Sequence, residues 1–284
     1  MANKASVGLV LGGGGLKAFA ATALFELLER ENITPQLLVG CSGGSFAAAA
    51  YGMGYRAAEI QELINQMVTK DLFRFDWRAM LGMAHVPVLG KFDYSSGIVR
   101  QEPILDMLRR FFKGADIRDL RTECRFQATD LQTGQAVVLT EGPVAEAVYA
   151  SCALFPVLPP IRIGDRLLGD GWYTSPLPML EALKGQADVI IGVVFEETVV
   201  PEAKNFLTAL HNQLNILKAS LTRAHTNIAI GLHHDEVLIV DMKFGQVEVW
   251  DVHELPGILE TGRRIVARYR DRILEVVDRS RTHA

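Results

Sequence analysis

VGLVLGGGGLK at residues 7–17 and LLVGCSGGS at residues 37–45 decide the fold predicted for this chain. In each stretch a short apolar run ends at a cluster of glycines, which is the pattern of a buried parallel strand followed by a tight turn. Helical periodicity follows both turns, over residues 16–31 and over the alanine-rich residues 45–55. The first 55 residues therefore predict strand, turn and helix twice over, and with them a parallel sheet joined by right-handed crossovers.

The remainder of the chain continues the alternation of helices and strands. Further helices are predicted at residues 57–68, 102–112 and 258–277, and further strands at residues 124–128, 136–139, 188–194 and 237–240. Neither an internal repeat nor a linker rich in proline, glycine and serine interrupts this pattern. We therefore expect a single domain over residues 1–284, built as a three-layer α/β sandwich around a mainly parallel central sheet.

The composition is that of an ordinary globular protein and excludes several classes. The 284 residues suffice for a full core, and contents of 49% hydrophobic and 22% charged residues exclude disordered and collagen-like chains. The 29 basic and 33 acidic residues give a net charge of −4, which argues against nucleic-acid binding because a nucleic-acid partner needs a basic docking face.

Cysteine usage and the lengths of the apolar runs predict the compartment. The three cysteines, Cys41, Cys124 and Cys152, are too few and too far apart for a disulfide framework or a zinc site. The apolar run at residues 7–11 is too short for a signal sequence, and no stretch reaches 18 uninterrupted apolar residues. We expect a soluble, cytoplasmic protein, while peripheral contact with the inner membrane face and the oligomeric state stay open.

Residues 40–44 form a G-x-S-x-G pattern between the second apolar run and the second helix. A serine at such a turn sits on a strained backbone with its hydroxyl exposed, and the following helix N-terminus favours developing negative charge. The alternative is a glycine turn whose serine only caps the helix. The position of the pattern favours a nucleophile at Ser42, and we assign no catalytic role to the neighbouring Cys41.

The glycine cluster at residues 12–15 has three interpretations. A phosphate-binding P-loop would need serine or threonine after Lys17, where Ala18 stands. A dinucleotide fingerprint fits loosely but lacks an acidic residue at the end of the second strand. The third interpretation is an oxyanion hole whose backbone N–H groups face Ser42, because adjacent parallel strands bring the two glycine turns to the same sheet edge. We favour the third interpretation because it uses both motifs at once.

A serine nucleophile needs a base, and Asp170 in the sequence LLGDGW at residues 167–172 is one candidate. By itself, an Asp-Gly pair is better explained as a β-turn. A later histidine would complete the Ser–Asp–His order of an α/β-hydrolase, but in that fold the serine turn follows more strands than it does here.

Three motifs, at residues 11–17, at residues 40–44 and at the Asp170-Gly171 pair, resemble the signatures of the patatin-like phospholipase family. The resemblance extends through residues 128–134, 150–153 and 159–160 and covers roughly residues 6–195. Residues 196–284 are less diagnostic, and we expect them to extend the same domain. Within the family, the chain resembles small bacterial members that carry little beyond the catalytic domain.

The resemblance implies a serine acyl hydrolase, a lipase or phospholipase A-type esterase, that cleaves acyl esters of lipids and needs neither metal nor cofactor. Ser42 would form an acyl-enzyme, and Asp170 would act as its base without a histidine. Backbone N–H groups of Gly13, Gly14 and Gly15 would form the oxyanion hole. A dry, apolar pocket would make the carboxyl group a better base by raising its pKa.

Three positions depart from the family pattern. Ala18 stands where glycine is usual, Trp172 where glycine or alanine is usual, and Phe155 where proline is usual. We expect Lys17 and Trp172 to contact the substrate. The Trp172 ring could narrow the acyl pocket, help to dehydrate Asp170 or block the site.

Two other functions stay open at this point: an acyltransferase on a related scaffold, and a catalytically silent binding or regulatory module. Residues 73–83, rich in aromatic residues and methionine, predict either a lid that admits lipid or a core segment. The sequence HHDE at residues 233–236 favours a solvated turn over a metal site. The basic amphipathic helix at residues 258–277 favours a solvated face over membrane contact.

Overall fold

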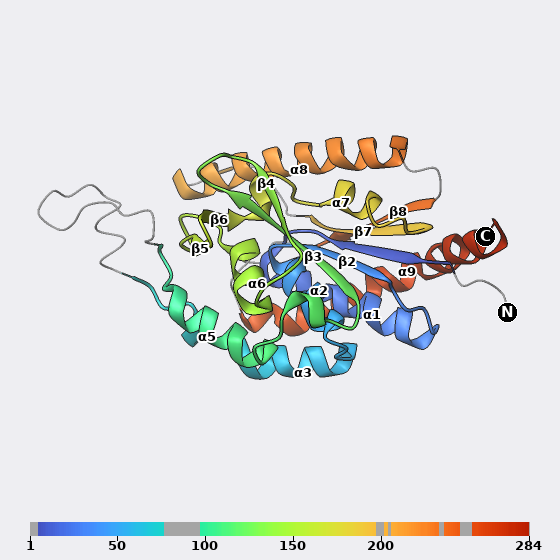
Figure 1. Cartoon of the computed structure of the whole chain (residues 1–284), viewed down its shortest axis with the longest axis horizontal. Coiled ribbons are helices and arrows are strands. Elements are labelled where there is room, and N and C mark those ends of the chain that lie inside the picture. The colour runs from blue at the N-terminus through green and yellow to red at the C-terminus, as the bar shows by residue number, and fades with distance from the viewer. Residues whose placement is uncertain are drawn as a thin grey trace, which may run out of the picture.

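The central sheet is assembled from strands spread along the chain (Figure 1). The computed structural model describes residues 5–76, 97–196, 202–203, 206–232, 236–244 and 252–283. Its strands are β1 (Val7–Leu11), β2 (Leu37–Cys41), β3 (Glu123–Asp130), β4 (Ala136–Leu139), β5 (Ile161–Ile163), β6 (Arg166–Asp170), β7 (Val189–Glu196) and β8 (Glu236–Lys243). Strands β3, β2, β1, β7 and β8 lie side by side in parallel, which confirms the mainly parallel sheet.

Strand β3 carries the antiparallel part of the sheet. Phe126 pairs with both β2 and β4, and Ala128 pairs with both β4 and β6. A strand residue has only two sides on which to pair, so β6 lies on the same side of β3 as β2 and begins to pair where β2 ends. The register places Cys41 opposite Gln127 and Asp170 opposite Ala128. The ends of β2 and β6 therefore meet along β3.

Helices cover both faces of the sheet. They are α1 (Ala21–Arg30), α2 (Gly43–Gly52), α3 (Ala57–Met67), α5 (Gln101–Phe112), α6 (Val144–Cys152), α7 (Met179–Leu183), α8 (Phe206–Leu232) and α9 (Leu255–His283). Figure 1 shows α7 and α8 on one face and α1, α2, α6 and α9 on the other, which confirms the α/β fold class with helices flanking a central sheet. None of the helices that the structure describes combines the length and apolar content needed to cross a bilayer.

Strand β1 shows why the apolar runs predict buried strands. All five of its residues are buried, with Leu9 and Leu11 in the core beneath α1 and α2, and Val10 in the core beneath α7. A strand with helices on both faces has no polar side, so its sequence is a continuous apolar run instead of an alternating one.

Several elements differ from those predicted. The helix expected over residues 16–31 begins as a 3-10 helix, Gly15–Ala20, and becomes α-helical only at Ala21. Strands β5 and β6 and helices α6, α7 and α8 were not predicted at all. Of the segment 73–83, residues 77–83 lie outside the described residues; Phe73 packs against the core and Phe75 is exposed. Residues 233–235 of the HHDE sequence also lie outside them.

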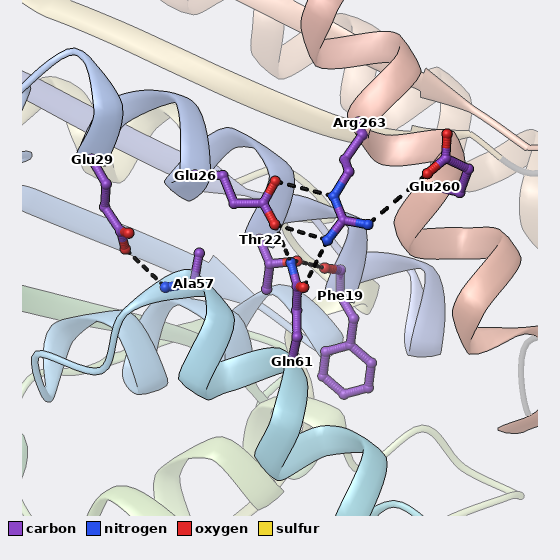
Figure 2. Close-up of polar contacts among 8 residues, drawn as sticks. All are labelled: Phe19, Thr22, Glu26, Glu29, Ala57, Gln61, Glu260 and Arg263. Carbon is purple, nitrogen blue, oxygen red and sulfur yellow. Dashed lines mark hydrogen bonds and ion pairs between the residues drawn. The ribbon is translucent and has the colours of Figure 1, made fainter.

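Helix α9 is fixed to α1 and α3 by a polar network at its exposed edge (Figure 2). The Arg263 guanidinium donates two hydrogen bonds to Glu26, at 3.1 and 2.9 Å, and one to Gln61 Oε1 at 2.9 Å. Gln61 Nε2 in turn donates to Glu26 and to Thr22 Oγ1. The apolar side of α9 packs into the main core, so its arginines form a solvated face, as predicted.

Candidate active site

Ser42 occupies the turn between β2 and α2 in a strained conformation. Its φ of 52° and ψ of −130° are unfavourable for a residue with a side chain. Three hydrogen bonds hold this backbone: Ser42 N–H donates to Ser151 Oγ at 2.9 Å, and Ser42 O accepts from Ser45 N and Ser45 Oγ. The side chain of Ser42 is only partly buried. These are the strained backbone and accessible hydroxyl expected for the serine of a G-x-S-x-G turn.

The two glycine turns lie against each other, as the sequence predicts. A Cβ atom at Gly43 would lie 2.2 Å from Gly15 O, and one at Gly44 would lie 2.3 Å from Leu11 O. Side-chain atoms cannot approach a backbone oxygen so closely, so both positions require glycine. A Cβ at Gly13 would lie 3.3 Å from Ser42 Cβ. The glycine loop therefore borders the serine directly.

Asp170 meets Ser42 across the end of β2. Ser42 Oγ donates a hydrogen bond to Asp170 Oδ2 at 2.9 Å, and Trp172 N–H donates to Asp170 Oδ1 at 2.8 Å. The strand register explains the meeting, because Asp170 pairs with β3 one position beyond the residue that faces Cys41. The structure thus brings together the hydroxyl and carboxyl groups that the sequence analysis singled out, and Asp170 ends a strand instead of forming a simple Asp-Gly turn.

Burial raises the pKa of Asp170 from 3.8 to about 7. Asp170 is 1% exposed, and loss of hydration disfavours the charged form of its carboxyl group. The hydrogen bonds from Trp172 N–H and Ser42 Oγ and the positive charge of Lys218 act in the opposite direction. A carboxyl group with a pKa near neutrality accepts a proton far more readily than one in water.

The backbone N–H groups of the glycine loop differ in whether a carbonyl group accepts from them. Gly12 N–H donates to Val193 O, and Gly13 N–H donates to Pro176 O at 2.9 Å. A neighbouring carbonyl group therefore already accepts from Gly13 N–H, and a role of this group toward an oxyanion stays a prediction. Gly14 and Gly15 are further candidates: neither N–H has a backbone acceptor within the described residues, Gly14 is the N-cap of the 3-10 helix and Gly15 is its first residue.

The two residues expected to contact substrate differ in accessibility. Lys17 is buried within the 3-10 helix, so a substrate would have to reach it inside the protein. Trp172 is half-buried and lies near the serine, since a Cβ at Gly13 would lie 3.5 Å from Trp172 Cδ1. Because the Ser42 side chain stays partly accessible beside this ring, the interpretation that Trp172 blocks the site loses support. Contact of either residue with a substrate stays a prediction.

Three residues that the sequence analysis did not single out support the site. Ser151 Oγ donates to Gln127 O at 2.6 Å while accepting from Ser42 N, and Thr129 Oγ1 donates to Asp170 O at 2.8 Å. Lys218, from α8, adds positive charge close to Asp170. Ser151 lies in a small-residue stretch that was noted, but nothing in its sequence context indicates its partner.

Alternative chemistry at the site finds little support. Burial raises the pKa of the Cys41 thiol well above its usual value, so it stays protonated and is a poor nucleophile. His225 hydrogen-bonds with Ser175, through Nδ1 at 3.2 Å, and not with the serine–aspartate pair. Within the ranges that the structure describes, no group of three or more His, Cys, Asp or Glu side chains is placed to share a metal ion.

Comparisons with known proteins identify the family of this chain. The patatin-like phospholipase family matches residues 9–183, a range that contains both glycine turns and Asp170. An uncharacterised NTE family protein of Mycobacterium tuberculosis is 30% identical over 187 residues, which cover 66% of this chain and 48% of that protein. A protein named lysophospholipase NTE1 of Debaryomyces hansenii is 28% identical over 191 residues, covering 66% of this chain and 12% of that protein.

Among solved structures, the chain is similar to VipD from Legionella pneumophila, with a TM-score of 0.49 and 11% sequence identity over 95% of this chain and 67% of that one. The chain spans about half the length of the mycobacterial proteins that it matches.

Proposed function

Because this chain belongs to the patatin-like phospholipase family, we propose that it is a serine acyl hydrolase that cleaves acyl esters of lipids through a Ser42–Asp170 dyad. The family itself supports a lipid ester hydrolase in general terms. The observation that carries the finer proposal is the 2.9 Å hydrogen bond from Ser42 Oγ to a buried carboxyl group whose pKa is about 7.

In the proposed first half-reaction, Ser42 Oγ attacks the ester carbonyl carbon while its proton passes to Asp170 Oδ2. The carbonyl oxygen becomes an oxyanion, for which the N–H groups of Gly14 and Gly15 are the proposed donors. The C–O bond to the alcohol then breaks, and the alkoxide takes the proton from Asp170. The products of this step are the free alcohol and an acyl group esterified to Ser42.

In the proposed second half-reaction, Asp170 accepts a proton from a water molecule as that water attacks the acyl-enzyme. Collapse of the second tetrahedral intermediate returns the proton to Ser42 Oγ and releases the fatty acid. The scheme needs no histidine, since the aspartate serves as base and acid in both steps. It also needs a partly accessible serine, which is what the half-buried side chain of Ser42 supplies.

Contact with a lipid surface is part of this proposal. The outer side of α8 exposes large apolar residues, among them Leu217 at 64% and Leu232 at 60%, and Phe75 is exposed at 56%. Apolar side chains on a helix that also borders the site suit a lipid interface, where the substrate is found. A cytoplasmic location at the inner membrane face stays a prediction from the sequence.

The test is hydrolysis of p-nitrophenyl esters of graded chain length, and of single-chain phospholipids, by the purified protein, with Ser42→Ala and Asp170→Asn as variants. We expect both variants to lose at least a hundredfold in kcat, and a fluorophosphonate probe to label the wild type but not Ser42→Ala. Full activity of Ser42→Ala would refute the proposal. An unlabelled wild-type serine would support a silent binding module, and acyl transfer to added glycerol in preference to water would support a transferase.

A further inference from the structure

Helix α8 turns a polar side toward the protein. Its buried polar residues are Asn212, Asn215, Lys218 and Thr222. They recur at spacings of three and four residues, so they form one stripe along the helix. A helix packed on a sheet normally buries its apolar side, and burying a lysine is unfavourable unless its charge has a counterpart. The stripe therefore places four polar side chains, one of them charged, against the body of the protein.

The N-terminal half of this stripe lies at the edge of the sheet that holds the site. Strands β7 and β8 are parallel, so the helix that connects them runs antiparallel to both and begins near the carboxyl ends of the strands. Figure 1 shows α8 extending across this face of the molecule. Asn215 lies about one turn nearer that edge than Lys218, since a helix rises about 1.5 Å per residue.

Lys218 is adjacent to the glycine loop. Its Nζ donates a hydrogen bond to Phe195 O at 3.3 Å, at the carboxyl end of β7. Phe195 packs directly on Gly14, where an added Cβ would lie 2.6 Å from Phe195 Cβ. Lys218 is 8% exposed, and its charge also lowers the pKa of Asp170 against the larger effect of burial. The ammonium group is thus close enough to Asp170 to affect its pKa, and it lies near Gly14 of the glycine loop.

A second contact fixes α8 against the aspartate loop. His225 Nδ1 and Ser175 Oγ are 3.2 Å apart, and Ser175 N–H donates to Gly171 O at 2.8 Å. Gly171 directly follows Asp170. The helix is therefore attached through Lys218 to the end of β7, beside the glycine loop, and through His225 to the aspartate loop.

Asn215 supplies the observation that points to a ligand. Its side chain is 7% exposed, and its Nδ2 group has no hydrogen-bond partner within the part of the chain that the structure describes. Buried polar groups are nearly always hydrogen-bonded, so an orphaned donor calls for an acceptor. The side-chain amide nitrogen and the lysine ammonium are both donors, and one of them is positively charged. Together they suit a group with several anionic oxygen atoms.

We propose that Asn215 and Lys218 form a subsite for a phosphate group carried by the alcohol part of the ester substrate. The inference rests on the proposed function and adds to it the residues that select the substrate. A phosphate seated on α8 would hold the scissile ester between the glycine loop and Ser42. Lys218 is then a specificity-determining residue, and Asn215 is a second donor to the same group.

The experiment compares two soluble esters that differ only in the phosphate, 1-hexanoylglycerol 3-phosphate and 1-hexanoylglycerol, each below its aggregation concentration. The readout is the ratio of their kcat/KM values. Because attack on the ester is common to both substrates, the ratio cancels any effect of a variant on the dyad. The variants are Lys218→Met, Lys218→Arg and Asn215→Leu. The matched controls are Arg223→Met and Asn227→Leu, which change exposed residues of the same helix.

We expect the wild type to favour the phosphate ester at least tenfold, and Lys218→Met to reduce that ratio about tenfold, mainly through KM. Asn215→Leu should reduce it several-fold, Lys218→Arg should retain most of it, and the two controls should leave it unchanged. Glycerol 3-phosphate should inhibit hydrolysis of the neutral ester competitively in the wild type and much more weakly in Lys218→Met.

A wild-type ratio near one, or equal ratios in the wild type and Lys218→Met, would overturn the inference while leaving the proposed function intact. Hydrolysis of neither ester would instead count against the proposed function itself. If Lys218→Met does not fold, as judged by its thermal transition, Asn215→Leu and inhibition by glycerol 3-phosphate decide the question.

Discussion

Replacing Asp170 by asparagine should stabilise the protein at alkaline pH while abolishing turnover. Asparagine is nearly isosteric, and its side chain can keep both hydrogen bonds of the aspartate, accepting from Trp172 N–H and donating to Ser42 Oγ. What it removes is the charge. Since burial raises the pKa of Asp170, ionising this group in the folded protein is unfavourable, and a neutral replacement avoids that penalty.

The sign and the window follow from the two pKa values. Below the unfolded-state value of 3.8, the carboxyl group is protonated in both states and the penalty vanishes. As pH rises to about 7, the unfolded chain ionises first, so the folded state of the wild type loses stability progressively. Above that value the penalty is constant. A shift of one pKa unit corresponds to about 1.36 kcal/mol, so the penalty is about 4 kcal/mol at pH 8 and about 2 kcal/mol at pH 5.

The assay is urea unfolding of the wild type and Asp170→Asn at pH 5 and pH 8. The advantage of the variant in free energy of unfolding should grow by about 2–3 kcal/mol between the two pH values. Asp165→Asn, which changes an exposed aspartate at the turn between β5 and β6, is the control and should show no comparable growth. An advantage that stays constant with pH, or that shrinks as pH rises, would refute the reasoning that Asp170 ionises at the expense of stability.

Four further outcomes are expected. The kcat/KM for a soluble ester should rise about tenfold per pH unit below an apparent pKa of about 7, as Asp170 loses its proton; a flat profile from pH 5 to 8 would contradict its role as base. Ser151→Ala should lower kcat at least tenfold and the free energy of unfolding by about 1–3 kcal/mol, because Ser42 N and Gln127 O both lose their partner; an unchanged urea midpoint would argue against this. Ser42→Gly should be more stable than Ser42→Ala by about 1 kcal/mol in free energy of unfolding, and should unfold at a higher temperature, since glycine relieves the strain at φ 52°. The reverse order would show that no strain is stored. Arg263→Met should change stability by less than about 1 kcal/mol, because the guanidinium is 44% exposed, and its effect should shrink further in high salt.

The part of the fold around the glycine turns was predictable because a strand buried on both faces has a continuous run of apolar residues. Strands β1 and β2 are short apolar runs that end at glycine, and their register places the two turns together as expected. Helix α8 was not predicted, because its buried stripe is polar and its exposed side is apolar. The usual rule, that the apolar side of a helix faces the core, does not hold for it. Helix α7 has only five residues and follows Pro178, too short to show a period.

The site was predictable in its residue types but not in its contacts. Ser42 and Asp170 stand beside glycines that mark their motifs in the sequence, and the structure supplies the steric reason for these glycines. The acceptor of the Gly13 N–H group is Pro176 O, and that pairing depends on a loop more than 160 residues away along the chain, which no local pattern specifies. The support from Ser151 depends likewise on how α6 docks against β3.

Strand β3 accounts for the coexistence of a strained serine and a dehydrated carboxyl group at one point. Gln127 O holds Ser151, which holds the backbone of Ser42, and two residues along the same strand Thr129 holds the backbone of Asp170. Both unfavourable features, together of the order of several kcal/mol, are thus attached to one buried strand and not to mobile loops. Burying a single large apolar side chain contributes about 1.5–3 kcal/mol, so the core beneath this strand can offset them with a few residues. The strained backbone of Ser42 and the dehydrated carboxyl group of Asp170 are for this reason supported from the buried half of β3.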